Sequence, residues 1–235
     1  PEDRLGLVLY DDRGYLAKPL DYYGKADVEK LKKHILEITS RGGTYMESGL
    51  KIATEQYQKY LEVDKNEYEN RLIFMTDAMP NIGETGDDQL LAMTERNATQ
   101  GIYTTFIGMG VDFNTKLIDH ITKIRGANYY SVHSEKSFTD LLDSGFDYMV
   151  TPLVFNLALT VQAEGYQIEK VFGSPEADEA TGEIMKVNTL FPSKTADGQT
   201  KGGLVLLKLK PTGAPTSELK LKVSYEDRQG HPDGA

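Results

Sequence analysis

A short apolar segment that stops at a carboxylate constrains this chain more than any other feature. Residues Leu72, Ile73, Phe74 and Met75 have the length and composition of a strand buried on both faces, as in a parallel sheet covered by helices. Asp77 follows almost at once, and open α/β sheets place their ligand sites at the carboxyl ends of strands. A carboxylate there suits a hard cation such as Mg2+ or Ca2+. An Asp at the end of a strand also commonly caps the next turn, so spacing alone leaves both interpretations open.

The first 150 residues alternate between strand-like and helix-like patterns. We expect strands at 5–11, 15–20, 72–76, 102–109 and 129–132, and helices at 25–39, 46–61, 89–99, 115–124 and 138–149. The first two strands flank Asp12-Arg13-Gly14, which predicts a hairpin. The alternation predicts an α/β domain over residues 1–150, built on a doubly wound, mostly parallel sheet.

The pattern changes at Thr151-Pro152. Strand-like segments follow at 154–163, 166–172, 183–187, 203–210 and 218–226, separated by Gly and Pro. Lys208, Lys210, Lys220 and Lys222 alternate with Leu and Val, which predicts strands with one solvated face. We therefore expect a small all-β, sandwich-like domain over residues 151–235.

Composition excludes several classes of function. The net charge of −10, without a cluster of Lys and Arg, argues against nucleic acid and anionic lipid as partners. The chain has no Cys, and its four His residues lack the spacing of zinc ligands. It contains no Gly-x-Ser-x-Gly motif and no phosphate-binding Gly-x-x-x-x-Gly-Lys loop, so we expect no enzyme. No apolar run is long enough to span a membrane.

Two loops resemble those of von Willebrand factor type A domains. Thr76-Asp77-Ala78-Met79-Pro80-Asn81 is similar to the family's Thr-Asp-Gly-x-Pro-Asn loop, and Gly42-Gly43-Thr44 is similar to its Gly-Gly-Thr loop. In the family these loops contribute to a metal-ion-dependent adhesion site. The resemblance implies that Thr44 and Asp77 are metal ligands for Mg2+, or for Mn2+ or Ca2+. It also implies a protein partner whose carboxylate completes the coordination of the ion.

The chain departs from the family in one important respect. The family's first metal loop, Asp-x-Ser-x-Ser, occurs nowhere in it, and the opening segment, residues 1–10, resembles the family's second strand. We therefore expect the central first strand to be missing, and to be supplied by upstream sequence or by another chain. The two remaining ligands are too few to hold Mg2+ tightly, so the site is expected to be complete only in the complete protein. Ala78 replaces the family's Gly, and Ala tolerates fewer backbone conformations.

Several neighbouring residues could act with these ligands. Asp11 and Asp12 could deepen the negative potential at the site or serve the hairpin turn, and Tyr45 and Met46 could contact a partner or be buried. Three acidic side chains could line the rim of the metal site or belong to a solvated loop: Glu84, Asp87 and Asp88.

The leading hypothesis is a divalent-cation-dependent protein-binding or adhesion module. The alternative is a structural scaffold domain with a silent or incomplete metal site. A third class is an accessory subunit of an intracellular ATP-driven metal-insertion complex, where type A domains also occur. The β-rich region resembles segments that follow the type A domain in bacterial proteins similar to inter-alpha-trypsin inhibitor heavy chains. It favours an extracellular, cell-surface or periplasmic location.

Overall fold

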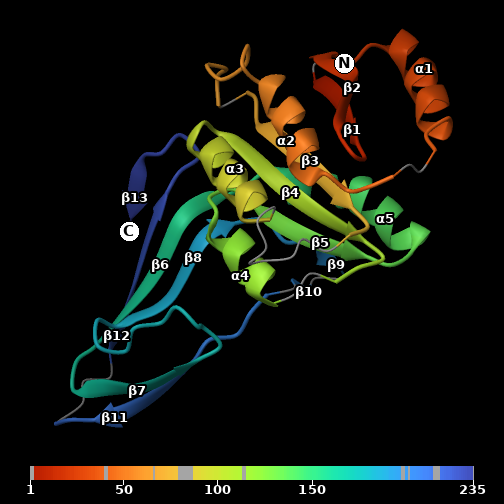
Figure 1. Ribbon diagram of the computed structural model, residues 1–235. Coiled ribbons are helices and arrows are strands. Elements are labelled where there is room, and N and C mark those ends of the chain that lie inside the picture. The colour runs from red at the N-terminus through yellow and green to blue at the C-terminus, as the bar shows by residue number, and fades with distance from the viewer. Residues whose placement is uncertain are drawn as a thin grey trace. The chain divides into compact units, whose positions relative to one another are not determined.

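The computed structural model describes residues 3–39, 42–65, 67–78, 87–112, 115–196, 199–200, 202–213 and 218–234 (Figure 1). It divides the chain into two compact units. The first contains residues 1–64, 68–121 and 129–133, and the second contains residues 65–67, 122–128 and 134–235. No helix among the described residues is both long enough and apolar enough to cross a bilayer.

The first unit contains a hairpin, a three-stranded sheet and four helices. Strands β1 (Arg4–Tyr10) and β2 (Gly14–Tyr22) pair antiparallel, which confirms the predicted hairpin. Strands β3 (Asn70–Thr76), β4 (Ile102–Met109) and β5 (Asn128–Val132) form a sheet in the order β3-β4-β5, in which β3 and β4 run parallel. The helices are α1 (Lys25–Leu36), α2 (Met46–Glu55), α3 (Asp87–Thr99) and α4 (Thr115–Lys123).

The core of the first unit lies around β4, as expected for a parallel strand covered on both faces. Seven of its eight residues are buried, and Ile102, Phe106 and Ile107 are almost inaccessible to solvent. Leu50 of α2 and Leu90 of α3 contribute fully buried side chains to the core, and so do apolar residues of α4. Burial of these side chains is the main force that closes helices onto the sheet.

Helix α2 approaches the hairpin closely because two glycines allow it. A Cβ at Gly14 would lie 2.6 Å from the backbone oxygen of Ser48, and one at Gly49 would lie 2.8 Å from the Tyr10 ring. The Gly14 N–H donates a hydrogen bond to the Ser48 hydroxyl over 2.7 Å. These contacts fix the first turn of α2 against the hairpin.

The second unit is built mainly from antiparallel strands, as predicted for the carboxyl-terminal region. One sheet has the order β13-β12-β6-β8, and a second pairs β11 with β7. These strands are β6 (Val154–Ala163), β7 (Tyr166–Phe172), β8 (Glu183–Leu190), β11 (Leu206–Pro211), β12 (Leu219–Glu226) and β13 (Pro232–Gly234). A short third pair joins β9 (Thr195–Ala196) to β10 (Gln199–Thr200). Val161, Val171 and Ile184 form a small core to which both larger sheets contribute.

Several elements differ from the sequence-based expectation, among them the short strands β9 and β10, which no pattern predicted. Helix α2 ends at Glu55 instead of continuing to residue 61, because the chain tightens into successive turns after it. The helix expected at 138–149 is two helices, α5 (Glu135–Leu142) and α6 (Phe146–Val150). The break follows from the Gly145 N–H, which donates to Asp140 O five residues back and so interrupts the helical ladder. The strand β13 was not predicted, since its three residues gain a strand conformation only by pairing with β12.

Tyr57, in the turns after α2, provides a test of how side chains pack in the first unit. Burial raises the pKa of its hydroxyl to about 12, partly offset by the charge of Arg71. The unfolded chain ionises near its ordinary pKa of 10 while the folded chain does not, so this residue's contribution to stability is lost as pH rises from 10 to about 12. We expect ultraviolet titration of the folded protein to show one tyrosinate forming near pH 12, and Tyr57→Phe to remove it. A Tyr57 that ionises with the exposed tyrosines would contradict the burial described above.

Candidate cation site

Asp77 lies where the sequence predicts, directly beyond the carboxyl end of β3. The Thr76 side chain before it is buried, and its hydroxyl accepts a hydrogen bond from the Ala78 N–H over 3.1 Å. This local turn directs the chain away from the sheet and leaves Asp77 exposed. Asn156 is the only non-glycine residue with positive φ in the described ranges, so Ala78 occupies its position without left-handed strain.

Thr44 lies in the short segment directly before α2, and it is also exposed. The segment is fastened to the β1–β2 turn by two hydrogen bonds. The Gly43 N–H donates to Asp12 Oδ1 over 2.7 Å, and the Tyr45 N–H donates to Asp11 O over 2.7 Å. The hairpin turn therefore sets the position of Thr44.

The two glycines before Thr44 make room for the Asp12 carboxylate. A Cβ at Gly42 would lie 2.4 Å from Asp12 Oδ2, and one at Gly43 would lie 2.5 Å from Asp12 Oδ1. Gly42 also has a φ of +33°, which side chains rarely adopt. Asp12 is thus a positioning residue for the Thr44 loop. From the sequence, two roles were open for Asp12, in the potential at the site or in the hairpin turn, and neither of them is this contact. The contact spans 31 residues, so no local pattern could identify it.

Tyr10, at the end of β1, connects the hairpin to the Asp77 region. Its hydroxyl donates to Met75 O over 2.7 Å, and its ring stacks on Phe74 with centroids 5.3 Å apart. Burial raises the pKa of Tyr10, and the negative charge of Asp77 raises it further. The ends of β1 and β3 therefore lie together, with the Thr44 loop fastened to one and Asp77 following the other.

The Thr44 hydroxyl and the Asp77 carboxylate make no hydrogen bond to any other residue that the structure describes. Both are oxygen donors, the kind that Mg2+, Mn2+ and Ca2+ prefer. Across the described ranges, however, no group of three or more His, Asp or Glu side chains is arranged to hold a metal ion. Oxygen ligands of this type suit a hard cation, but two of them provide only part of its coordination shell. Their role as ligands stays a prediction.

The structure distinguishes the other candidate residues by their exposure to solvent. Met46 is buried in the core, whereas Tyr45 is 52% exposed and remains accessible to a partner. Pro80, Asn81 and Glu84 lie outside the described residues. Asp87 and Asp88 open α3, but the positions of their side chains are also outside the described part.

The fold and the two loops define a class: an α/β domain with an open parallel sheet and oxygen donors at its carboxyl edge, followed by antiparallel β-sheets. Residues 1–144 match the von Willebrand factor type A domain, so the chain belongs to that family. Domains of this family bind proteins and are usually non-catalytic. The boundary at residue 150 stays a prediction, because the match ends earlier and the compact units are interleaved.

Several solved structures are similar to this chain, and the first of them supports the fold alone. A von Willebrand factor type A protein from Catenulispora acidiphila is 12% identical, with a TM-score of 0.53 over 95% of this chain. This chain spans only 54% of that protein. BatB from Bacteroides thetaiotaomicron is 16% identical, with a TM-score of 0.47 over 63% of this chain and 80% of its own. Proximal thread matrix protein 1 of the mussel byssus, solved with zinc in its adhesion-site motif, is 22% identical, with a TM-score of 0.47 over 65% of this chain and 38% of its own.

Proposed function

We propose that this chain is part of a divalent-cation-dependent protein-binding module, in which a carboxylate of the partner completes the coordination of the ion. The observation that carries the proposal is the state of Thr44 and Asp77. Both are exposed, and both keep their oxygens free of hydrogen bonds to other described residues. Each also has a neighbouring anchor, since the Asp12 carboxylate accepts from the Gly43 N–H in the Thr44 loop and buried Thr76 precedes Asp77.

Mg2+, Mn2+ or Ca2+ would be held by the Thr44 hydroxyl and the Asp77 carboxylate, with further oxygens from elsewhere in the complete protein. The bound ion would supply a positive charge with an open coordination position for an acidic side chain. The residues of this chain would hold the two donors in place, because the Asp12–Gly43 hydrogen bond restricts the loop before α2. Tyr45, next to Thr44 and half exposed, is suited to contact the partner beside the ion.

Metal binding is the direct test. We expect Asp77→Asn and Thr44→Val each to weaken Mn2+ and Mg2+ binding at least tenfold, measured by titration calorimetry. Asp147→Asn is the matched control, because it removes an exposed carboxylate of α6 in the other compact unit. Equal ion binding by all four proteins would remove Thr44 and Asp77 from the site.

The alternative is a structural scaffold with a silent or incomplete metal site. The lack of a three-residue ligand group in the described ranges favours it. The same titration distinguishes the two, since a scaffold binds no ion and keeps its protein contacts when a chelator is added.

We also propose an extracellular, cell-surface or periplasmic location, which fractionation of producing cells would test. Recovery only in the cytosol would contradict it.

A further inference from the structure

Three large apolar side chains lie exposed at one end of the β7–β11 sheet. Phe172 of β7 is 52% exposed, Leu206 of β11 is 55% exposed, and Leu204, just before β11, is 72% exposed. Phe172 and Leu206 are direct partners in the register of the two strands, which Figure 1 shows side by side. Single apolar side chains on a surface are ordinary, whereas clustered ones are typical of interaction sites.

The alternation of side chains along the strands explains why this cluster points outward. Val171 is buried, and Val205 and Leu207 pack against the small core to which it belongs. Successive side chains of a strand point to opposite faces, so Phe172 and Leu206 face away from this core. Their exposure follows from the strand register that buries their neighbours.

Gly173 brings the backbone of Leu204 to the same place. Gly173 follows Phe172 with a φ of +86°, and a Cβ there would lie 2.1 Å from Leu204 O. The two backbone segments approach this closely only because position 173 has no side chain. Leu204 therefore lies beside the end of β7, and we call Phe172, Leu204 and Leu206 the apolar patch.

Charged side chains of both signs border the apolar patch. Lys170 and Lys208 are partners in the next row of the same face, where two like charges repel each other. Each has a carboxylate nearby, since Lys208 Nζ lies 3.1 Å from Glu169 Oε1 and Lys170 Nζ lies 3.8 Å from Glu179 Oε1. This balance of charge disfavours an anionic membrane, which attracts clustered Lys and Arg. A border that carries both signs is complementary to a second copy of itself.

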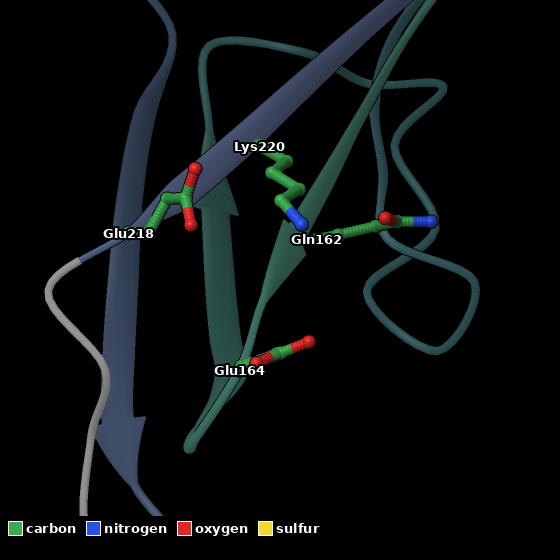
Figure 2. A pocket seen from close by; sticks show the side chains of 4 residues that line it. All are labelled: Gln162, Glu164, Glu218 and Lys220. Atoms are coloured by element: carbon green, nitrogen blue, oxygen red, sulfur yellow. The ribbon is translucent and has the colours of Figure 1, made fainter.

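A pocket elsewhere in this unit is polar by comparison. Gln162, Glu164, Glu218 and Lys220 line it, and Figure 2 shows them where β6 ends and β12 begins. Across the described ranges, no group of three or more His, Asp or Glu side chains is placed to hold a metal ion. The pocket gives no reason to expect a ligand, so the apolar patch is the stronger sign of a partner.

We propose that the apolar patch is the interface of a weak homodimer, in which two copies of this chain meet around a two-fold axis. The apolar side chains of one copy pack against the same residues of the other, and burial of this surface provides the attraction. Lys and Glu side chains of the two borders pair across the axis and fix the orientation of the copies. Three side chains are few beside the core of a permanent dimer, so the association is reversible.

Dilution of the chain, followed by NMR and by sedimentation velocity, tests the proposal. We expect a concentration-dependent equilibrium between monomer and dimer, with amide shift changes confined to residues 169–173 and 204–208. Phe172→Ser/Leu206→Ser should weaken the dimer at least tenfold and keep the fold, because both side chains are more than half exposed. Leu221→Ser is the matched control, since Leu221 is 60% exposed but belongs to the sheet that contains β12.

An exchange of charges tests whether the partner is a second copy. Lys208→Glu and Glu169→Lys should each dimerise at least threefold more weakly alone, and an equimolar mixture should regain most of the lost affinity. An unaltered chain that stays monomeric, shift changes elsewhere, a mixture that regains nothing, or equal loss in Leu221→Ser would each overturn the proposal. Binding of a monomeric chain to vesicles of phosphatidylcholine and phosphatidylserine would also overturn it, and would assign the apolar patch to a membrane.

Discussion

Gly14→Val is expected to destabilise the first compact unit by about 3 kcal/mol, because no side chain fits between the hairpin and α2. A Cβ at this position would lie 2.6 Å from Ser48 O and 2.7 Å from Ile52 Cδ1. The first contact is with backbone, which cannot turn aside as a flexible side chain can. The backbone of α2 must therefore move away from the hairpin, and the Gly14–Ser48 hydrogen bond is lost with it.

The same substitution should also disturb the candidate cation site. Thr44 lies two residues before α2, and the hairpin turn that follows β1 holds its loop through Asp11 and Asp12. Separating α2 from the hairpin pulls on both ends of this loop. We expect Gly14→Val to weaken ion binding as well as to lower the free energy of unfolding.

Urea unfolding followed by circular dichroism measures the first effect. Gly203→Ala is the matched control, since a Cβ there meets no atom within 4 Å and should change stability by less than about 0.5 kcal/mol. Similar stability of the two variants would show that α2 and the hairpin are not packed as described.

Arg125→Ala is expected to cost the second unit about 2 kcal/mol, more than an exposed ion pair contributes. The Arg125 guanidinium donates to Glu226 Oε1 over 2.6 Å and lies 3.7 Å from the centroid of the Phe155 ring. Asn156 donates to the other oxygen of the same carboxylate over 2.8 Å. The substitution removes a charge-assisted hydrogen bond and a cation–π contact together, and leaves a partly buried carboxylate without its cation.

The loss should depend on pH in a defined direction. Arg125 lowers the pKa of Glu226, assisted by Asn156. A carboxylate whose folded pKa lies below its unfolded pKa of 4.5 adds stability above that value, and this stability is lost as pH falls through the folded pKa. The difference between the unaltered chain and Arg125→Ala should therefore be full at pH 7 and shrink below pH 4.5.

Thermal unfolding at several pH values measures this difference. Lys208→Ala is the matched control, because Lys208 and Glu169 form an ion pair with both side chains largely exposed, 61% and 48%. It should change stability by less than about 1 kcal/mol at any pH. An Arg125→Ala variant that behaves like Lys208→Ala would show that the contact adds nothing beyond a surface pair.

The sequence by itself determined the order and type of most elements. Hydrophobic periodicity predicted the hairpin, the strands at 72–76 and 102–109, and the change to antiparallel strands after residue 151, because burial of a regular element requires a regular pattern. It also located Asp77, since a carboxylate that follows a buried strand must lie at the edge of the sheet. Thr44 was found by resemblance to a family loop, which is again a local signal.

Only the tertiary structure decided what supports these residues. Asp12 contacts Gly43 across 31 residues, Tyr57 reaches Arg71 O from the turns after α2, and Tyr10 bonds Met75 across 65 residues. Strand β13 also exists only beside β12. Sequence patterns report the neighbours that lie within a turn or along a strand. A hydroxyl or carboxylate that bonds a distant backbone group leaves no periodic trace, because its partner is chosen by how the folded elements meet.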